Sequence, residues 1–263
     1  MYDHTQQRDG GLLQPQRRER ILEQVQESRQ VYASDLAEKL GVSTYTIRRD
    51  LDEMAEAGLL ERVHGGAVLR SSTSRTFDER QHESLVQKRQ SAHAALALLK
   101  PNQIVVVDGG STAAIFAESI PMNFPATFVT HAPYIAMKLI ERSPTEVITI
   151  GGRLDPLSRA SVGSKTVDSF RSIAADLCIL GVWGLSVEGG IVSPYYEESL
   201  VRKTMIESSQ QVVGLAIGSK LGTNGAFTIG PITALTHLSV ESGVEAESLR
   251  PYAKAGIKVL RES

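Results

Sequence analysis

The chain has 263 residues, of which 41% are hydrophobic and 22% charged, with a formal net charge of −2. It is long enough for two modest domains, each with a core of its own. It lacks a run of about 18 apolar residues, and its polar first residues lack a secretory apolar stretch, so we expect a cytoplasmic protein without a membrane span. The single cysteine, Cys178, excludes an intrachain disulfide, and its apolar neighbours predict a buried side chain rather than a catalytic thiol.

The overall charge neither favours nor excludes a nucleic-acid partner, because a basic patch can lie on one face of a neutral protein. Even residues 17–70 alone carry nine Lys and Arg against ten Asp and Glu. Any interpretation as a DNA-binding protein therefore depends on where the charges fall along the chain.

The N-terminal part has the pattern of a small helical domain. Residues 1–16 lack apolar periodicity and are expected to form a disordered leader. Apolar residues at helical spacing then predict helices over 17–28, 34–40 and 43–57, with Gly41 and Gly58 ending the second and third. Two short strands around His64-Gly65-Gly66 follow within 59–69 and predict a wing. Residues 17–70 are thus interpreted as a winged helix-turn-helix.

The start of the third helix carries residues that suit DNA. Ser43 stands at the expected N-cap, and with Ile47 facing inward the side chains near the helix start point outward. Arginine pairs with guanine or phosphate, hydroxyl groups bond phosphate or base edges, and a Gly-Gly wing can approach the backbone closely. The expected DNA contacts are Ser43, Thr44, Tyr45, Thr46, Arg48, Arg49, Arg62, His64 and Gly65. Taken alone, the arginines could be a solvated helix face and His-Gly-Gly an ordinary hairpin turn, but their order and spacing together favour DNA binding.

The rest of the chain predicts a linker followed by an α/β domain. Residues 71–100 are interpreted as a polar linker and a long connecting helix from Phe77 to Lys100. From 101 to 263, apolar β-branched runs alternate with helix-length segments, which indicates a mostly parallel sheet covered on both faces. The strands are expected at 104–107, 127–129, 147–150, 177–180, 212–217 and 235–240.

Small and polar residues follow five of these strands and predict one binding site. The carboxyl ends of parallel strands meet at one edge of the sheet, where ligands of open α/β domains bind. A loop of small residues opening a helix offers free N–H groups to a phosphate or carboxylate, so we expect an anionic small molecule. The residues expected to line this site are Asp108, Gly109, Gly110, Ser111, Thr112, Thr130, His131, Gly152, Arg153, Gly181, Trp183 and Lys220. No metal, cofactor or catalytic residue is expected.

Both halves resemble the DeoR family of transcription regulators. The string Thr-Ile-Arg-Arg-Asp-Leu at 46–51 and the wing His-Gly-Gly-Ala at 64–67 carry the resemblance, which extends over nearly everything after residue 16. It implies a repressor of a carbohydrate operon that binds operator DNA as a homodimer or homotetramer, with a ribose-5-phosphate-isomerase-like sensor domain for a phosphorylated sugar. By this resemblance, Asp108, Gly109, Ser111 and Thr112 would line a phosphate loop, Lys220 would pair with the anion, and Glu198 would meet a sugar hydroxyl.

The chain departs from the family pattern at four positions, and other functions compete. His131, Trp183, Arg202 and Ile217 stand where the family commonly has Asn, Asp, Lys and Asp, which bears on the identity of the ligand. Trp183 could stack on a sugar ring or fill the core. A sugar-phosphate isomerase with a helical appendage would need a carboxylate base, for which Asp108, Glu197 and Glu198 are the candidates. A DNA-binding protein without a ligand is the third possibility.

Overall fold

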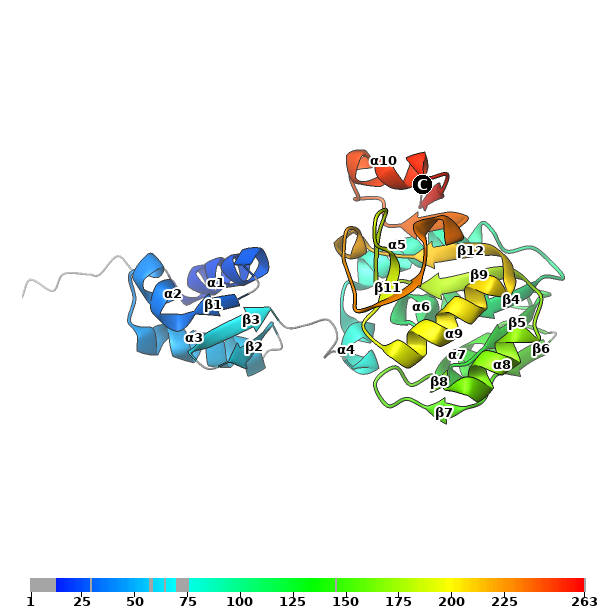
Figure 1. Cartoon of the computed structure of the whole chain (residues 1–263), viewed down its shortest axis with the longest axis horizontal. Helices are drawn as coiled ribbons and strands as arrows, with labels where there is room; N and C mark the ends of the chain where they lie inside the picture. The colour runs from blue at the N-terminus through cyan, green and yellow to red at the C-terminus, as the bar shows by residue number, and fades with distance from the viewer. Residues whose placement is uncertain are drawn as a thin grey trace, which may run out of the picture. The chain divides into compact units, whose positions relative to one another are not determined.

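The computed structural model of the chain (Figure 1) describes residues 13–28, 30–56, 59–63, 65–69, 76–144 and 146–262. The chain divides into two compact units, Met1–Ser74 and Arg75–Ser263. None of the helices in the described ranges is both long and apolar enough to cross a bilayer.

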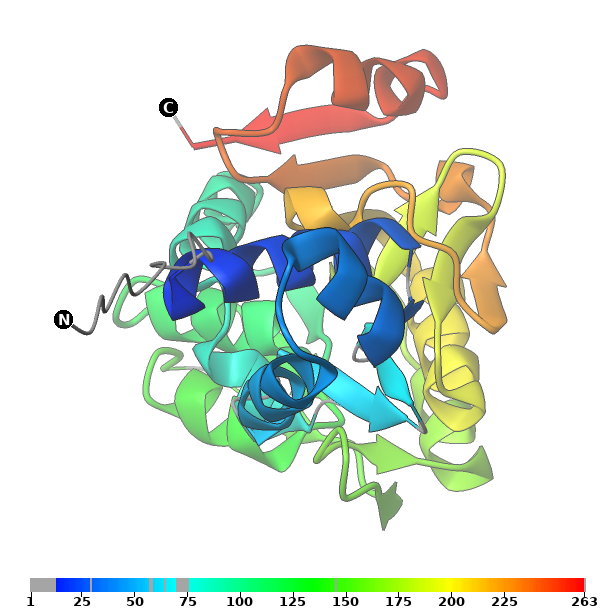
Figure 2. The same ribbon diagram turned by 90° about the vertical axis from the view of Figure 1, so that its left-hand side faces the viewer.

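The first unit is a winged helix-turn-helix, as predicted. Figure 2 shows its three helices (blue) together with the cyan hairpin. In chain order its elements are α1 (Gln14–Ser28), β1 (Gln30–Tyr32), α2 (Ala33–Leu40), α3 (Thr44–Glu56), β2 (Leu60–Val63) and β3 (Gly66–Leu69). The apolar stripes predicted from the sequence form its core, in which Ile21, Leu36, Ile47, Leu51 and Met54 are almost completely buried. The helical periodicity therefore reflects burial against a shared core.

The turn between α2 and α3 confirms the predicted stop at Gly41. This glycine adopts a left-handed conformation with a φ of 65°, and its N–H bonds to the carbonyls of Ala37 and Glu38 at the end of α2. Glycine adopts such a φ without steric cost. The stop predicted at Gly58 lies outside the described residues.

Strand β1 was not predicted, and it fixes the wing. The sheet has the antiparallel order β1-β3-β2, with Tyr32 opposite Gly66. A Cβ at Gly66 would lie 1.9 Å from the backbone oxygen of Val31, so only glycine permits this close approach of the two strands.

The second unit begins with two helices where the sequence predicted one. The expected helix from Phe77 to Lys100 is divided into α4 (Phe77–His82) and α5 (Leu85–Leu96). Between them Ser84 has a φ of 50°, a left-handed conformation that a continuous helix cannot contain. Thr76 caps α4 by accepting the N–H of Glu79, whose carboxylate in turn accepts the N–H of Thr76.

The centre of the second unit is a seven-stranded, wholly parallel sheet with the order β15-β14-β12-β9-β4-β5-β6. Its strands are β4 (Ile104–Val107), β5 (Thr127–Thr130), β6 (Glu146–Thr149), β9 (Ala175–Gly181), β12 (Ser209–Leu215), β14 (His237–Val240) and β15 (Lys258–Arg261). All six predicted strands are present within a few residues, and the terminal β15 was missed.

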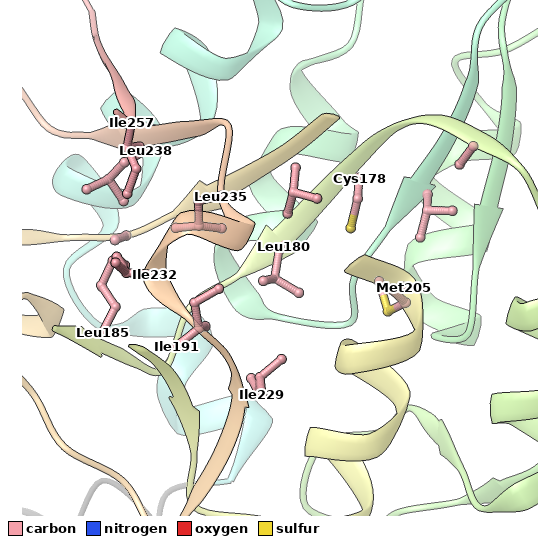
Figure 3. Close-up of a cluster of buried hydrophobic side chains, with 14 of the residues drawn as sticks. Cys178, Leu180, Leu185, Ile191, Met205, Ile229, Ile232, Leu235, Leu238 and Ile257 are labelled. Atoms are coloured by element: carbon pink, nitrogen blue, oxygen red, sulfur yellow. The ribbon is translucent and has the colours of Figure 1, made fainter. Parts of the chain in front are cut away.

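Helices cover both faces of this sheet (Figure 1). Besides α5, the helices are α6 (Ser111–Ser119), α7 (Pro133–Ile140), α8 (Ser164–Arg171), α9 (Tyr196–Glu207) and α10 (Ala246–Lys254). Val105 and Val107 pack in one cluster with α5, α6 and α7, whereas Val106 packs in the other with α8 and α9. This alternation is what a strand buried on both faces requires. Figure 3 shows the second cluster, in which Cys178 is fully buried as predicted.

Two small antiparallel sheets complete the unit, and neither was predicted. One joins β10 (Gly184–Ser186), β11 (Gly190–Ser193) and β13 (Phe227–Gly230), and the other joins β7 (Arg153–Leu154) and β8 (Ser161–Val162). These strands are two to four residues long and rich in glycine and serine, so they lack the apolar runs by which the parallel strands were found.

Strand order changes direction between β4 and β9. From β4 the chain proceeds to β5 and β6 on one side, and from β9 to β12, β14 and β15 on the other. The carboxyl ends of strands at such a point are the usual ligand position in open α/β sheets. The predicted loop at 108–112 opens there.

Candidate functional site

The start of α3 is capped and exposed. Ser43 accepts the N–H of Thr46 at 3.1 Å, which confirms the predicted N-cap. Tyr45 is 77% exposed, and Arg48 and Arg49 are exposed as well, while Ile47 is fully buried. The first turn and a half of α3 thus presents hydroxyls and guanidinium groups to the outside, with Thr44 and Thr46 half-buried beside them.

Two acidic residues of α3 hold three arginines in ion pairs. Glu53 pairs with Arg49 at 3.2 Å and with Arg18 of α1, and Asp52 pairs with Arg62 of β2 at 2.6 Å. These carboxylates follow the exposed start of α3 along the helix, and the sequence alone did not show their partners. Arg49 and Arg62 are therefore partly neutralised, which leaves Arg48 the more available cation of the Arg48-Arg49 pair.

Asp50 anchors α3 to α1 and was missed as a structural residue. Its carboxylate is 1% exposed and lies 2.5 Å from Nε of Arg17 and 3.3 Å from Nε of Arg18. Burial alone would raise the pKa of Asp50, but the bonds from Arg17 and Arg18 outweigh it and lower that pKa. The signal was present in the sequence, since Asp50 follows the buried Ile47 by three residues and so shares its face.

The wing turn has the predicted glycine in a left-handed conformation. Gly65 is exposed with a φ of 80°, and no atom lies within 4 Å of the position of a Cβ there. The preceding His64, an expected DNA contact, lies outside the described residues.

In the second unit, the candidate site at the ends of β4 and β9 is built around Asp108. Its side chain is fully buried, and Nε of Arg202 lies 3.3 and 3.2 Å from its two oxygens. Oδ2 also accepts the backbone N–H of Gly181 at 3.0 Å. A Cβ at Gly181 would lie 3.0 Å from this same oxygen, so a larger residue would crowd the carboxylate. Gly181 and Arg202, which lie 73 and 94 positions after Asp108 in the sequence, thus meet at its carboxylate.

Arg202 joins Asp108 to Glu198 across the first turns of α9. Its Nη1 lies 2.7 Å from Oε2 of Glu198, and both side chains are about nine-tenths buried. Burial alone would lower the pKa of Arg202, but the two carboxylates outweigh it and raise that pKa, so the guanidinium stays charged. Oε1 of Glu198 is buried and has no hydrogen-bond partner among the described residues. This Asp108–Arg202–Glu198 group is therefore rigid, yet it keeps one acceptor unsatisfied.

His131 lies against the same group as a neutral base. Its Nε2 is 3.6 Å from Oδ1 of Asp108, and the side chain is 6% exposed. Burial, with a further contribution from Arg202, lowers the pKa of His131 to about 4 although Asp108 opposes the shift. Its Nδ1 is buried without a partner in the described part of the chain. A neutral imidazole has one donor and one acceptor nitrogen to offer.

The loop 109–112 opens helix α6 beside this group. Gly110 is the N-cap residue and makes no side-chain cap, so the N–H groups of the first turn, from Ser111 onward, project from the helix start. Ser111 is buried and Thr112 half-buried. The carbonyl of Gly109 accepts a hydrogen bond from the hydroxyl of Tyr134, a residue that the sequence did not single out. Nothing in the apolar pattern of α7 could have revealed this contact.

Three residues that were predicted to line the site make other contacts. The hydroxyl of Thr130 accepts the N–H of Ala132 and so stabilises the turn after β5. Arg153 is exposed on β7, where it pairs with Glu197. A Cβ at Gly152 would lie 2.1 Å from Oγ1 of Thr166, so this glycine serves close packing. Of these three residues, Thr130 is the buried one. It directly precedes His131 and lies on β5, the strand that pairs with β4.

Trp183 and Lys220 meet at the end of β9. Nζ of Lys220 lies 5.7 Å from the centroid of the indole, within reach of a cation–π contact. Trp183 is half-buried, outside the hydrophobic clusters, and its Nε1 is buried without a hydrogen-bond partner in the described ranges. The ring therefore presents an unused donor and an aromatic face. No group of three or more potential metal ligands occurs in the described residues.

We expect Asp108→Ala to destabilise the second unit by about 3 kcal/mol, because it leaves the buried guanidinium of Arg202 with one partner instead of two. Glu197→Ala, which breaks only the exposed pair with Arg153, should cost less than about 1 kcal/mol. Urea unfolding followed by tryptophan fluorescence measures both, and equal midpoints for the two variants would contradict the importance of the buried group.

His131 should make stability depend on pH in a defined window. The pKa of about 4 lies below the ordinary value of 6.5, so between these values the unfolded chain binds a proton that the folded chain does not. Stability should therefore fall as the pH drops from 6.5 to 4, by about 3 kcal/mol in full. His131→Asn should flatten this part of the urea-midpoint profile, and an unchanged profile would show that His131 is protonated in the fold.

Comparisons with known proteins agree with the two units. Residues 17–73 match the model of the DeoR-like helix-turn-helix domain, and residues 83–242 match that of the DeoR C-terminal sensor domain. The HTH-type transcriptional regulator GlpR of Haloferax volcanii is 32% identical over 95% of this chain and 98% of its own length. The glycerol-3-phosphate regulon repressor of Escherichia coli is 30% identical over 84% of this chain and 88% of its own length.

Among solved structures, ribose 5-phosphate isomerase A of Methanocaldococcus jannaschii superposes with a TM-score of 0.37 and 15% identity over 51% of this chain and 52% of that one. This likeness is too weak to carry an argument. The curated relatives are transcriptional regulators rather than enzymes. The two family models and the full-length relatives together show that this chain belongs to the DeoR family of transcription regulators.

Proposed function

We propose that the protein is a sequence-specific repressor of a carbohydrate operon whose affinity for operator DNA is changed by a phosphorylated sugar or a related anionic metabolite. The observation that carries the effector half of this proposal lies at the ends of β4 and β9, where the helix start of α6 is found together with buried polar atoms that have no partner among the described residues. The repressor half is supported by the family and by relatives named as repressors. We place its action in the cytoplasm.

The DNA-reading surface is proposed on the exposed start of α3 and at the wing. Thr44, Tyr45, Arg48 and Arg49 would face the major groove, and the Gly65 turn would approach the backbone. Because helix-turn-helix proteins commonly read paired half-sites, the proposed active form is a homodimer or homotetramer.

The anionic part of the effector is proposed at the start of α6. The N–H groups of the first turn attract a phosphate, and Ser111 and Thr112 add hydroxyl donors there. Arg202 is not available for this purpose, since Asp108 and Glu198 already occupy its guanidinium. Lys220, over the indole of Trp183, is the cation proposed to complete the phosphate site.

The remaining polar atoms of the candidate site favour a ligand with hydroxyl groups. The unsatisfied Oε1 of Glu198 is an acceptor and Nε1 of Trp183 is a donor. A hydroxyl can donate to the first and accept from the second, whereas a second phosphate would be repelled by Glu198 and Asp108. This combination supports a polyol phosphate more than a simple dicarboxylate or a nucleotide base.

A short chain of contacts leads from the proposed phosphate loop to the first element after the linker. Tyr134 donates to the carbonyl of Gly109, and its ring lies 4.2 Å, centroid to centroid, from that of Phe77 at the start of α4. Phe77 is 3% exposed and its N–H bonds to the carbonyl of Leu157. We propose that a ligand ordering the loop biases α4 through Tyr134, which is how occupancy would reach the DNA-binding unit.

Fluorescence anisotropy with the chain's own upstream DNA tests the proposal. We expect binding that resists unlabelled competitor of unrelated sequence and that one phosphorylated compound, from a panel of phosphorylated sugars and glycerol 3-phosphate, weakens by about five- to 150-fold. Its unphosphorylated parent is the control. Specific binding that no compound changes would contradict the effector assignment, and absence of specific binding would contradict the repressor.

Tyr134→Phe tests the relay separately. It removes one hydrogen bond, worth about 1 kcal/mol, so the effect of the active compound on DNA affinity should shrink by about fivefold while DNA binding without ligand is kept. Tyr252→Phe is the matched control, because its hydroxyl also donates to a carbonyl, that of Leu185, in another part of the unit. A Tyr134→Phe protein with the full response would rule the relay out.

A further inference from the structure

Arg62 joins the wing to α3 through two different groups. Its Nε lies 2.6 Å from Oδ1 of Asp52 on α3, and its Nη1 donates to the backbone carbonyl of Gly66 at the start of β3. Arg62 itself is on β2, so one guanidinium connects both strands of the wing with the helix proposed to read DNA. Its side chain is 31% exposed, against 59% for Asp52.

The carbonyl that accepts the hydrogen bond from Arg62 belongs to Gly66, which is held between two strands. Gly66 pairs with Tyr32 of β1 and with Val63 of β2, and a Cβ there would collide with the backbone of Val31. The turn end of the β2–β3 hairpin is thereby fixed on β1. The Arg62–Asp52 ion pair links the other edge of the hairpin, strand β2, to the solvent-facing middle of α3.

We infer that Arg62 and Asp52 are positioning residues for DNA binding: their ion pair sets the angle between the wing and α3, and Arg62 acts through this pair rather than as a phosphate contact. The inference rests on the proposed reading of DNA by α3 and the wing. It reassigns Arg62, which the sequence suggested as a direct contact. A planar guanidinium suits the task because it can donate in two directions at once, which an ammonium on a flexible stem does less well.

The direction in which one substitution changes DNA affinity distinguishes a positioning role from a direct phosphate contact. Removing a carboxylate near DNA ordinarily strengthens binding, since the carboxylate repels phosphate. If Asp52 positions the wing, Asp52→Asn should instead weaken specific binding, by about two- to fivefold for an exposed hydrogen-bonded pair. Glu56→Gln, at another exposed acidic residue of α3, is the matched control and should leave binding unchanged or slightly stronger.

The experiment measures anisotropy of the full-length protein on its operator at several salt concentrations, for wild type, Asp52→Asn, Arg62→Gln, the double variant and Glu56→Gln. We expect Arg62→Gln to weaken binding without changing the salt slope, and Asp52→Asn to have no further effect in the Arg62→Gln background. Asp52→Asn binding as tightly as wild type, or a slope reduced by about 0.9 in Arg62→Gln, would overturn the inference.

Amide hydrogen exchange without DNA gives a second readout that does not depend on the operator. Asp52→Asn should speed exchange in β2 and β3, and Glu56→Gln should not. Unchanged exchange in both variants would overturn the positioning role even if no operator were found. Failure of the wild type to bind any specific DNA would instead count against the proposed function, so the two failures are distinguishable.

Discussion

The polar edge of the second unit depends on the buried contact between Asp108 and Arg202. Taking a carboxylate and a guanidinium out of water is unfavourable unless each finds charged or hydrogen-bonding partners in good geometry. Here Arg202 reaches both Asp108 and Glu198, and Asp108 also accepts the N–H of Gly181. The group therefore binds the ends of β4 and β9 to α9. It also occupies the guanidinium, so the anionic ligand that we propose would be bound by other groups, at the start of α6 and at Lys220.

The first unit uses the same kind of contact for another purpose. Asp50, buried at the middle of α3, is held by Arg17 and Arg18 of α1, and this fixes the direction of the helix that presents Tyr45 and Arg48. Exposed pairs such as Arg49 with Glu53 contribute little to stability but set where positive charge is available. In both units a buried carboxylate holds a helix in place through arginine, and the surface arginines that look alike in sequence make different contacts.

Much of the fold could be predicted because buried apolar residues recur at regular spacing in the sequence. The stripes of α1 to α3 and the apolar runs such as Ile104–Val107 gave the winged helix-turn-helix and the parallel sheet. Strands such as Gly184–Ser186 were missed, because short strands that contain glycine show no regular spacing of apolar residues. The divided helix at Ser84 was missed because a left-handed serine has no signal in one sequence.

The candidate site was only partly predictable for a related reason. Asp108, Gly181 and His131 were found because each ends a strand, and the ends of parallel strands meet. Arg202 was noticed only as a departure from the family pattern, and its partner Asp108 lies 94 positions away. Tyr134 and Asp50 act through contacts that depend on how helices pack, which periodicity cannot specify. Arg153 was expected at the site for its charge, yet its partner is Glu197 at the surface.

Hydrogen–deuterium exchange of the wild-type protein, with and without the phosphorylated compound that weakens DNA binding, tests the location of the effector site most directly. We predict that the ligand protects amides in the first turn of α6 and near Glu198, with a further change in α4. Protection confined to other parts of the second unit, with α6 and the start of α9 unaffected, would contradict the account.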